Sequence, residues 1–497
     1  MFKNFPGYKI LEGIQKKKSH KRERKFPLNA IKLIFIVAIT LVIAMLPTES
    51  FGIEGLTVVH QRIISLFVFA ALMWLTETMP SWVTSMVVVT VMLFTVSTSA
   101  FSFLRPEGGV GLVPFKSIFA CFSNPTIMLF IGGFVLAIGL TKVKLDVALA
   151  RVLLKPFGTR SEIVLLGFIL VTAIFSAFVS NTATAAMMLA FLTPVLRSLP
   201  ADGKGRIALA LAIPVGANLG GMMTPIGTPP NMIALDYLSS QGMGISFVDW
   251  TIKMAPFVIV LLVLAWILLR FMFPFKQKNI KIEIEGEIKW NYKTWSVVVA
   301  FALTIFMWMF GTDLWGIDTN VVAMIPVAIF CATGILTRRD LEEINWSVLW
   351  MVAGGFALGV ALNYSDANSA SLSSLIVKSV PFDNFSPLVV MILAGLICFG
   401  FSNFISHSAA TSLLVPVLGV VASGLGTALD AYGGPQAMLV GIAIASSVSM
   451  ILPISTPPNA IAHSTGFIEQ KDMMKVGIIV GLLGIVLGYA MLIFIGF

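Results

Sequence analysis

Apolar runs of about twenty residues recur along the chain and are separated by short polar connections. Runs of this length can cross a bilayer as α-helices. Two further apolar segments, about 162–195 and 387–421, are interrupted by polar clusters, which is typical of re-entrant hairpins. The pattern predicts an all-α polytopic membrane protein with about 11 transmembrane helices and two re-entrant hairpins. The expected spans are 28–47, 59–79, 82–100, 124–142, 206–236, 250–273, 295–311, 319–336, 345–363, 436–466 and 474–496.

Composition supports this fold class and excludes a soluble globular protein. Hydrophobic residues make up 57% of the 497 positions and charged residues only 11%. The net charge of +9 is concentrated in residues 1–27, directly before the first span. A basic arm at this place is typical of cytoplasmic retention and of attraction to anionic lipid, and no nucleic-acid-binding module is visible. Cys121, Cys331 and Cys398 show neither a disulfide framework nor metal-ligand spacing.

The distribution of Lys and Arg predicts the orientation in the membrane. With a cytoplasmic N-terminus, the connections 143–161, 196–206, 274–293, 337–344 and 467–475 are cytoplasmic, and all of them carry basic residues. The expected outer loops "DYLSSQGMGISFVDW", "GTDLWGID" and "SGLGTALDAYGGP" contain no Lys or Arg. This fit to the positive-inside rule requires one hairpin to enter from each side. We therefore expect a multi-pass protein of the cell (plasma) membrane.

Several stretches occur twice, in the same order and at nearly constant spacing. The paired stretches are "IGGFVLAIGL" at Gly132 with "AGGFALGVAL" at Gly354, "SNTATAAMML" at Ser180 with "SHSAATSLLV" at Ser406, and "TPPN" at Thr228 with "TPPN" at Thr456. Each unit contains five expected crossings, and an odd number forces the second copy to be inverted. Inverted repeats with interrupted hydrophobic segments are typical of secondary transporters, which bind substrate where the two copies meet.

The paired Pro-Pro sequences predict unwound turns at membrane depth. Proline lacks an N–H and disfavours helix in the residue before it, so Gly227–Thr228 and Ser455–Thr456 are expected in turns. Such turns offer carbonyl oxygens to a small cation. We also expect the helices that restart after them to offer N–H groups and positive dipole ends to an anion.

The polar hairpin tips suit a sodium-type cage without a carboxylate. Ser176 lies four residues before Ser180 and would share its face if that arm is helical. The alternative is that Ser and Thr merely bond to carbonyls one turn back and allow close packing, but the recurrence of the clusters favours function. His407 stands where the first copy has Asn181, and an intramembrane histidine is a functional candidate. His463 could equally be a packing residue.

The paired SNT-type motifs, the paired TPPN turns and the two-repeat layout resemble the divalent anion/sodium symporter family, which carries di- and tricarboxylates or sulfate. The resemblance covers nearly the whole chain except the basic arm. It implies a homodimer that works by an elevator-type movement. The implied scaffold is residues 28–160 and 276–375, and the implied transport domain is residues 161–275 and 376–497, each part with one hairpin and one broken helix.

The resemblance also implies the site residues. The implied substrate-binding residues are Ser180, Asn181, Thr182, Thr228, Pro229, Ser406, His407, Ser408, Thr456 and Pro457. The first sodium site corresponds to Ser176, Ser180, Asn181 and Gly227, and the second to Ser402, Ile405, His407 and Ser455. His407 departs from the usual Asn, because a protonated imidazole would repel sodium. The sequence therefore does not decide whether the second site binds sodium.

The leading hypothesis is therefore a sodium-coupled symporter of dicarboxylates of the succinate, malate and fumarate class, with Na⁺ as coupling ion and no organic cofactor. The alternatives within transport are a sodium-independent dicarboxylate exchanger and a sulfate or tricarboxylate carrier. An anion channel remains open. An enzyme is disfavoured because the polar clusters contain no Asp or Glu and no metal-ligand motif. A primary pump is disfavoured because no Walker A phosphate loop is present.

Overall fold

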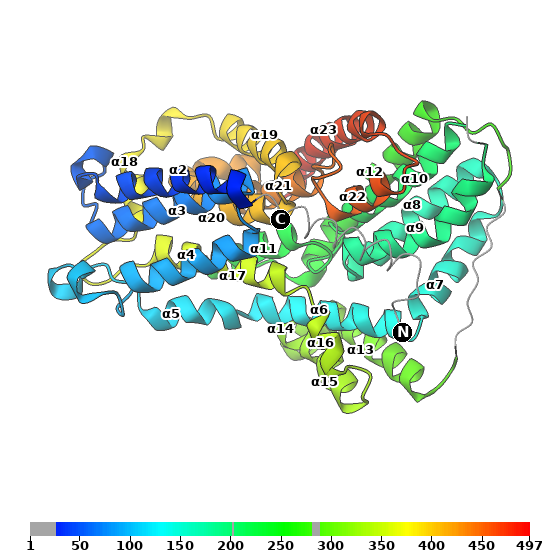
Figure 1. The fold of residues 1–497 in the computed structure, drawn as a ribbon, viewed down its shortest axis with the longest axis horizontal. Coiled ribbons are helices and arrows are strands. Elements are labelled where there is room, and N and C mark those ends of the chain that lie inside the picture. Colours follow the sequence, from blue (N-terminus) through cyan, green and yellow to red (C-terminus); the bar gives the residue numbers. More distant parts are fainter. Residues whose placement is uncertain (1–25, 201–202, 281–288) are drawn as a thin grey trace.

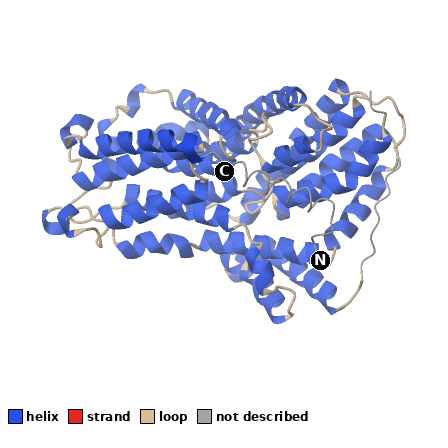
Figure 2. Cartoon of the chain, viewed as in Figure 1, coloured by secondary structure: helices blue, strands red, loops and turns tan. Residues whose placement is uncertain are grey.

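A computed structural model describes residues 26–200, 203–280 and 289–497, so nearly all of the basic arm lies outside it. The described chain is helical, with tan connections between the helices and no strand drawn (Figure 2). The first half contains α2 (Phe26–Met45), α3 (Val58–Thr76), α4 (Ser81–Thr95), α5 (Phe115–Ala120), α6 (Pro125–Lys142), α7 (Leu145–Leu154), α8 (Ser161–Phe178), α9 (Asn181–Ser198), α10 (Gly205–Gly220), α11 (Pro229–Ser240) and α12 (Phe247–Met272). The predicted all-α class is confirmed.

The second half repeats this order with similar elements. It contains α13 (Tyr292–Trp315), α14 (Thr319–Val322), α15 (Met324–Ala332), α16 (Arg338–Glu342), α17 (Trp346–Asn363), α18 (Leu372–Ser379), α19 (Pro387–Phe404), α20 (His407–Leu425), α21 (Gly434–Ser447), α22 (Pro457–Ser464) and α23 (Gln470–Phe494). Within the described ranges, nine helices are long and apolar enough to cross a membrane, and five shorter apolar helices accompany them. The number of crossings stays a prediction.

Both interrupted segments form pairs of helices joined by an extended residue. The break between α8 and α9 falls at Val179 (φ −123°, ψ 150°), and the break between α19 and α20 falls at Ile405 (φ −115°, ψ 168°). Ser180 and Ser406 then begin the second helix of each pair as N-cap residues. The expectation that Ser176 and Ser180 share one helical face is wrong, because α8 ends at Phe178 and Ser180 is no longer part of that helix.

The two TPPN turns have nearly the same backbone. Thr228 (φ −148°, ψ 144°) and Thr456 (φ −138°, ψ 150°) are both extended, and the Pro-Pro pair after each occupies the first two positions of α11 or α22. Proline suits these positions because its missing N–H would have no partner in the first turn. The predicted unwound turns therefore divide the expected spans 206–236 and 436–466 into α10 with α11 and α21 with α22.

The two repeats pack against each other through small residues. A Cβ added to Gly132 of α6 would collide with Ala323, next to α14, and one added to Gly354 of α17 would collide with Ser85 of α4. The first glycine of each GGF motif thus lets its own helix approach the other repeat closely. Figure 1 shows α13–α16 grouped along one edge of α6, and α8–α10 grouped apart from α2–α4.

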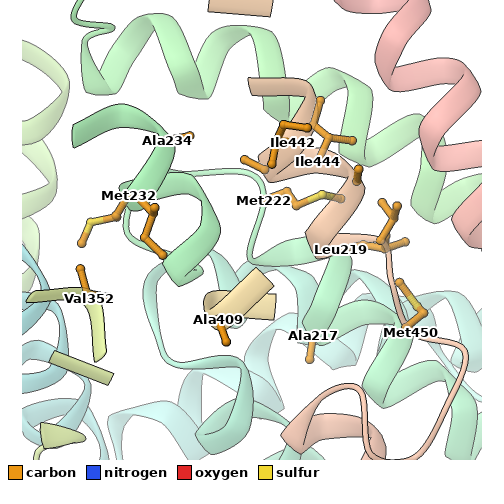
Figure 3. Packing of buried hydrophobic residues seen from close by; sticks show 14 of the residues in the cluster. Ala217, Leu219, Met222, Met232, Ala234, Val352, Ala409, Ile442, Ile444 and Met450 are labelled. Carbon is orange, nitrogen blue, oxygen red and sulfur yellow. The ribbon is translucent and has the colours of Figure 1, made fainter. Parts of the chain in front are cut away.

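The core between the hairpins is apolar and drawn from both repeats. Figure 3 shows Leu219 and Met222, at and just beyond the end of α10, near Ile442 and Ile444 of α21, with Met450 beside them. All five side chains are buried. Because α10 packs against α22 and α21 packs against α11, the broken helices of the two repeats are held against each other next to their turns.

Candidate functional site

A cavity of about 950 Å³ lies where the hairpin tips meet the two turns. All ten residues expected to bind substrate lie on its wall. They are Ser180, Asn181, Thr182, Thr228, Pro229, Ser406, His407, Ser408, Thr456 and Pro457. Segments that are more than 200 positions apart in the sequence therefore form one site, as the inverted repeat predicts.

The residues expected at the two sodium sites lie on this wall or directly behind it. Gly227 and Ser455 line the cavity together with the two hairpin tips. Ser176 and Ser402 are fully buried and Ile405 is 1% exposed, so these three form the layer behind the wall.

At the first tip three oxygen atoms crowd around one hydroxyl proton. The Ser176 Oγ lies 2.6 Å from the Asn181 Oδ1 and 2.7 Å from the carbonyl oxygen of Ala217. A serine has a single proton to donate, so it can hydrogen-bond only one of these two acceptors at a time. Oxygen atoms gathered in this way suit a small cation such as Na⁺, and they add the Ala217 carbonyl to the expected ligands.

The second tip is closed by hydrogen bonds instead. The His407 Nε2 lies 2.6 Å from the carbonyl oxygen of Ser449, so this nitrogen carries a proton and donates it. The Ser402 hydroxyl donates to Ser446 Oγ (3.2 Å), which in turn donates to the backbone carbonyl of His407 (3.0 Å). The imidazole N–H thus presents its positive end to a carbonyl that would otherwise be available to a cation. The ligand atoms available at the second tip therefore fit sodium less well than those at the first tip.

The two turn threonines also differ. The Thr456 Oγ1 accepts from the backbone N–H of Asn459 (3.2 Å) and from the Asn218 Nδ2 (3.3 Å). Both lone pairs of this hydroxyl are therefore occupied, and its own proton is left for an acceptor in the cavity. Thr228 makes no side-chain cap bond to α11. Asn218 Nδ2 also donates to Asn459 Oδ1 (3.0 Å), which ties α10 of one repeat to α22 of the other.

The expectation that α11 and α22 offer N–H groups to an anion is wrong. Their first two positions are prolines, the N–H of Asn459 is taken by Thr456, and the N–H of Asn231 donates to the Thr228 carbonyl (3.2 Å). The hairpin helices are better placed. No side chain caps α9, and Ser406 caps only Ala409 in α20, so the first N–H groups of both helices point towards the cavity end without a capping partner among the described residues.

The cavity wall carries little fixed charge. Among its lining residues, all of which the structure describes, there is no Lys or Arg, and Glu77 is the sole carboxylate. Hydroxyl, amide and backbone groups supply most of its polar surface. An anion bound here would find hydrogen-bond donors but no permanent positive side chain to balance its charge.

Four residues that shape the site were not predicted from the sequence. Gly221, Ser449, Asn218 and Ser446 lie at or just beyond the ends of α10 and α21. A Cβ at Gly221 would lie 2.6 Å from the Asn181 Oδ1, so this glycine makes room for the amide. Asn218 is the single amide side chain in the apolar run 205–220, and this isolated polar position could have identified it from the sequence. His463 is half-buried near the end of α22 and does not line the cavity.

Comparisons with known proteins identify relatives of the whole chain. The citrate transporter family model matches residues 71–436. An uncharacterized transporter of Haemophilus influenzae is 30% identical over 91% of this chain and 95% of its own length. The sodium-dependent dicarboxylate transporter SdcS of Staphylococcus saprophyticus is 30% identical over 85% of this chain and 84% of its own length, and SdcS of Staphylococcus aureus USA300 is 27% identical over 94% and 92%.

A solved structure shares the fold. The YdaH transporter of Alcanivorax borkumensis superposes with a TM-score of 0.56 at 14% identity, over 88% of this chain and 99% of that one. Both this structure and the Haemophilus influenzae relative match nearly the whole chain. Since these relatives are transporters, the chain is a membrane transporter and not an enzyme. The chain belongs to the divalent anion/sodium symporter family of di- and tricarboxylate transporters.

Proposed function

We propose that the protein is a sodium-coupled symporter of dicarboxylates of the succinate, malate and fumarate class. The observation that carries this proposal is the cavity between the hairpin tips, which offers N–H and O–H donors but no Lys or Arg. A dianion in such a cavity needs mobile cations to balance its charge, because an unpaired charge away from water is costly. The names of the SdcS relatives, which specify both sodium and dicarboxylate, support the same reading.

The proposed substrate contacts follow from the donors that are still available. One carboxylate would accept from the first N–H groups of α9 and the other from those of α20, with the Thr456 hydroxyl as an additional donor. The N-terminal ends of both helices also place their positive dipoles next to the anion. Two groups of N–H donors, one at the start of α9 and one at the start of α20, face the same cavity and suit a substrate with two carboxylates.

Sodium is proposed as cargo at the first tip. The Asn181 Oδ1 and the Ala217 carbonyl oxygen lie within 2.7 Å of the Ser176 hydroxyl oxygen there, and Gly227 lies on the adjacent wall. At the second tip, sodium would have to compete with the His407 N–H for the Ser449 carbonyl. The first site is therefore proposed as the tighter of the two.

The proposed movement is of the elevator type, by a transport domain of residues 161–275 and 376–497 against a scaffold of residues 28–160 and 276–375, in a homodimer. Asn345 lines the cavity next to the connection 337–344, which the charge pattern assigns to the cytoplasm. Glu77 and Ser81 line it where the expected spans 59–79 and 82–100 meet, and the expected order of crossings places this junction on the same side. We infer that the structure represents an inward-open state. Reaching the outside would require the hairpin tips to move together, since Asn218 and Asn459 link the two repeats.

A sodium gradient across proteoliposomes tests the proposal. Uptake of labelled succinate should require external sodium, and unlabelled citrate and sulfate in excess report on the tricarboxylate and sulfate alternatives. A sodium-independent exchanger would instead need internal dicarboxylate and would ignore the sodium gradient. Uptake that depends on preloaded dianion and not on sodium would therefore contradict symport.

A further inference from the structure

A second cavity, of about 490 Å³, lies between α6, α11, α17 and α20, and its residues differ from those of the substrate cavity. Ser240 and Gln241 line it and lie in the connection 236–250, which the charge pattern assigns to the outside. Its wall combines the proposed scaffold helices α6 and α17 with the proposed transport helices α11 and α20. The cavity therefore lies where these two parts would slide past each other.

Asp236 of α11 is the sole acidic side chain on this wall, and no Lys, Arg or His accompanies it among the lining residues, which are all described. Its Oδ1 accepts a hydrogen bond of 2.7 Å from the Thr126 hydroxyl of α6. Thr126 is 8% exposed, so the contact is largely shielded from water. A carboxylate without a basic partner inside a membrane protein is costly, and such residues commonly mark ion pathways.

A second polar group on the same wall has no partner. Ser412 of α20 is 1% exposed, and its Oγ makes no hydrogen bond within the part of the chain that the structure describes. It packs against Gly355 of α17, where an added Cβ would lie 3.0 Å from the Ser412 Cβ. A buried hydroxyl that is left unpaired loses its hydrogen bonds to water without replacement, so this position favours a ligand that binds oxygen.

We propose that this second cavity binds a sodium ion, with the Asp236 carboxylate as its charged ligand and wall oxygens, including the Ser412 hydroxyl, as neutral ligands. The proposal rests on the proposed sodium-coupled transport and deepens it. Oxygen-only ligands with one carboxylate suit a monovalent hard cation, and the wall provides no cluster of acids for a divalent one. The site is distinct from both hairpin tips.

A sodium ion here would neutralise a charge that has to move. Asp236 belongs to α11, which the elevator proposal places in the mobile part, whereas its hydrogen-bond donor Thr126 belongs to the static part. Carrying a bare carboxylate across the bilayer would be costly, and a bound cation removes that cost. Sodium would then be coupled to the movement itself as well as to the dianion.

The test compares Asp236→Asn with wild type in two assays. In proteoliposomes, the membrane potential that stops succinate flux gives the number of sodium ions moved per succinate, and Asp236→Asn should lower it by one. In detergent without substrate, sodium chloride in place of choline chloride should raise the melting temperature of wild type more than that of the variant. Asp313→Asn, which removes an exposed acid at the end of α13, should behave as wild type in both.

Ser412→Ala provides a milder variant if Asp236→Asn folds poorly, and it should raise the half-saturating sodium concentration several-fold with the coupling ratio unchanged. Wild-type sodium coupling and sodium stabilisation in Asp236→Asn would overturn the second site while leaving the proposed function intact. The second site would also be overturned if the ion that Asp236→Asn no longer moves with succinate is a proton instead of a sodium ion. Failure of wild type to take up succinate with sodium would reject the proposed function, and the stabilisation assay would still decide whether the second cavity binds sodium.

Discussion

At the first hairpin tip, the hydroxyl of Ser176 lies 2.6 Å from the amide oxygen of Asn181, whereas at the second tip the ring of His407 donates to the Ser449 carbonyl at 2.6 Å. The two tips have the same backbone break and the same position in their repeats. Their chemistry differs because one tip gathers acceptors and the other pairs each acceptor with a donor. Equal folds therefore do not provide equal cation sites.

The difference extends to the residues opposite each tip. Gly221 leaves space for the Asn181 amide, and its counterpart 228 positions later is Ser449, whose carbonyl holds the histidine. Likewise Asn218 reaches across to the other repeat, and its counterpart Ser446 bonds within its own repeat. Each tip has thus changed together with its facing turn. The following experiments test how much of transport depends on this asymmetry.

The largest effect is expected at the first tip. Asn181→Ala removes the oxygen next to Ser176 and should reduce sodium-driven uptake by about 10- to 150-fold, since losing a ligand to a charged group costs about 1.5–3 kcal/mol. Initial rates of succinate uptake in proteoliposomes measure it. Asn368→Ala, on an exposed loop, is the matched control. Full uptake by Asn181→Ala would contradict the assignment of the first site.

The next effect tests the facing residues. Gly221→Ala should reduce uptake about tenfold, because the new Cβ would press on the Asn181 amide and crowding in a packed site costs about 1–3 kcal/mol. Ser449→Ala should reduce uptake by no more than about fivefold, because it removes only a hydroxyl whose hydrogen bonds are worth about 1 kcal/mol. Comparable losses in the two variants, at equal amounts of folded protein, would show that the tips are not packed differently.

The third prediction converts one tip towards the other. His407→Asn removes the ring that occupies the Ser449 carbonyl and should lower the half-saturating sodium concentration about fivefold, equivalent to about 1 kcal/mol. A sodium titration of uptake at fixed succinate measures the shift. His463→Asn changes a histidine outside the cavity and should leave the curve in place. An unchanged curve in His407→Asn would argue that the histidine does not restrict sodium.

The smallest effect is expected at the turns. Thr456→Ala should raise the KM for succinate about threefold, because it removes both an N-cap and a donor to the substrate. Thr456→Ser keeps the hydroxyl and should remain close to wild type. Thr228→Ala should change KM less, since Thr228 has no cap bond to lose. A larger effect at Thr228 than at Thr456 would reverse the proposed roles of the two turns.

Much of this site could be predicted because chain-breaking residues have strong local effects. The Pro-Pro pairs fix the unwound turns whatever surrounds them, and the polar clusters at Ser180 and Ser406 interrupt apolar runs that would otherwise be continuous. The repeat then indicated that these four features converge. The ten substrate residues themselves were implied by the family resemblance, and all ten lie on one cavity wall.

What could not be predicted depends on side-chain contacts between distant segments. Nothing local distinguishes the Asn218 that ties two repeats together from an amide that faces a neighbouring helix. The direction of the His407 ring follows from the position of Ser449, which is set by packing. The N–H groups of α22 were expected to be available because the sequence does not show that Thr456 caps Asn459. Asp236 likewise became a candidate only when its neighbours were known.

The bond between Asn218 and Asn459 has a consequence for how the protein is made. Asn459 lies 241 positions after its partner. During synthesis α10 is therefore made long before α22, and the bond that joins the two halves of the cavity wall forms only after the second turn exists. We expect a product that stops between these two residues to contain the first hairpin tip but no complete substrate site.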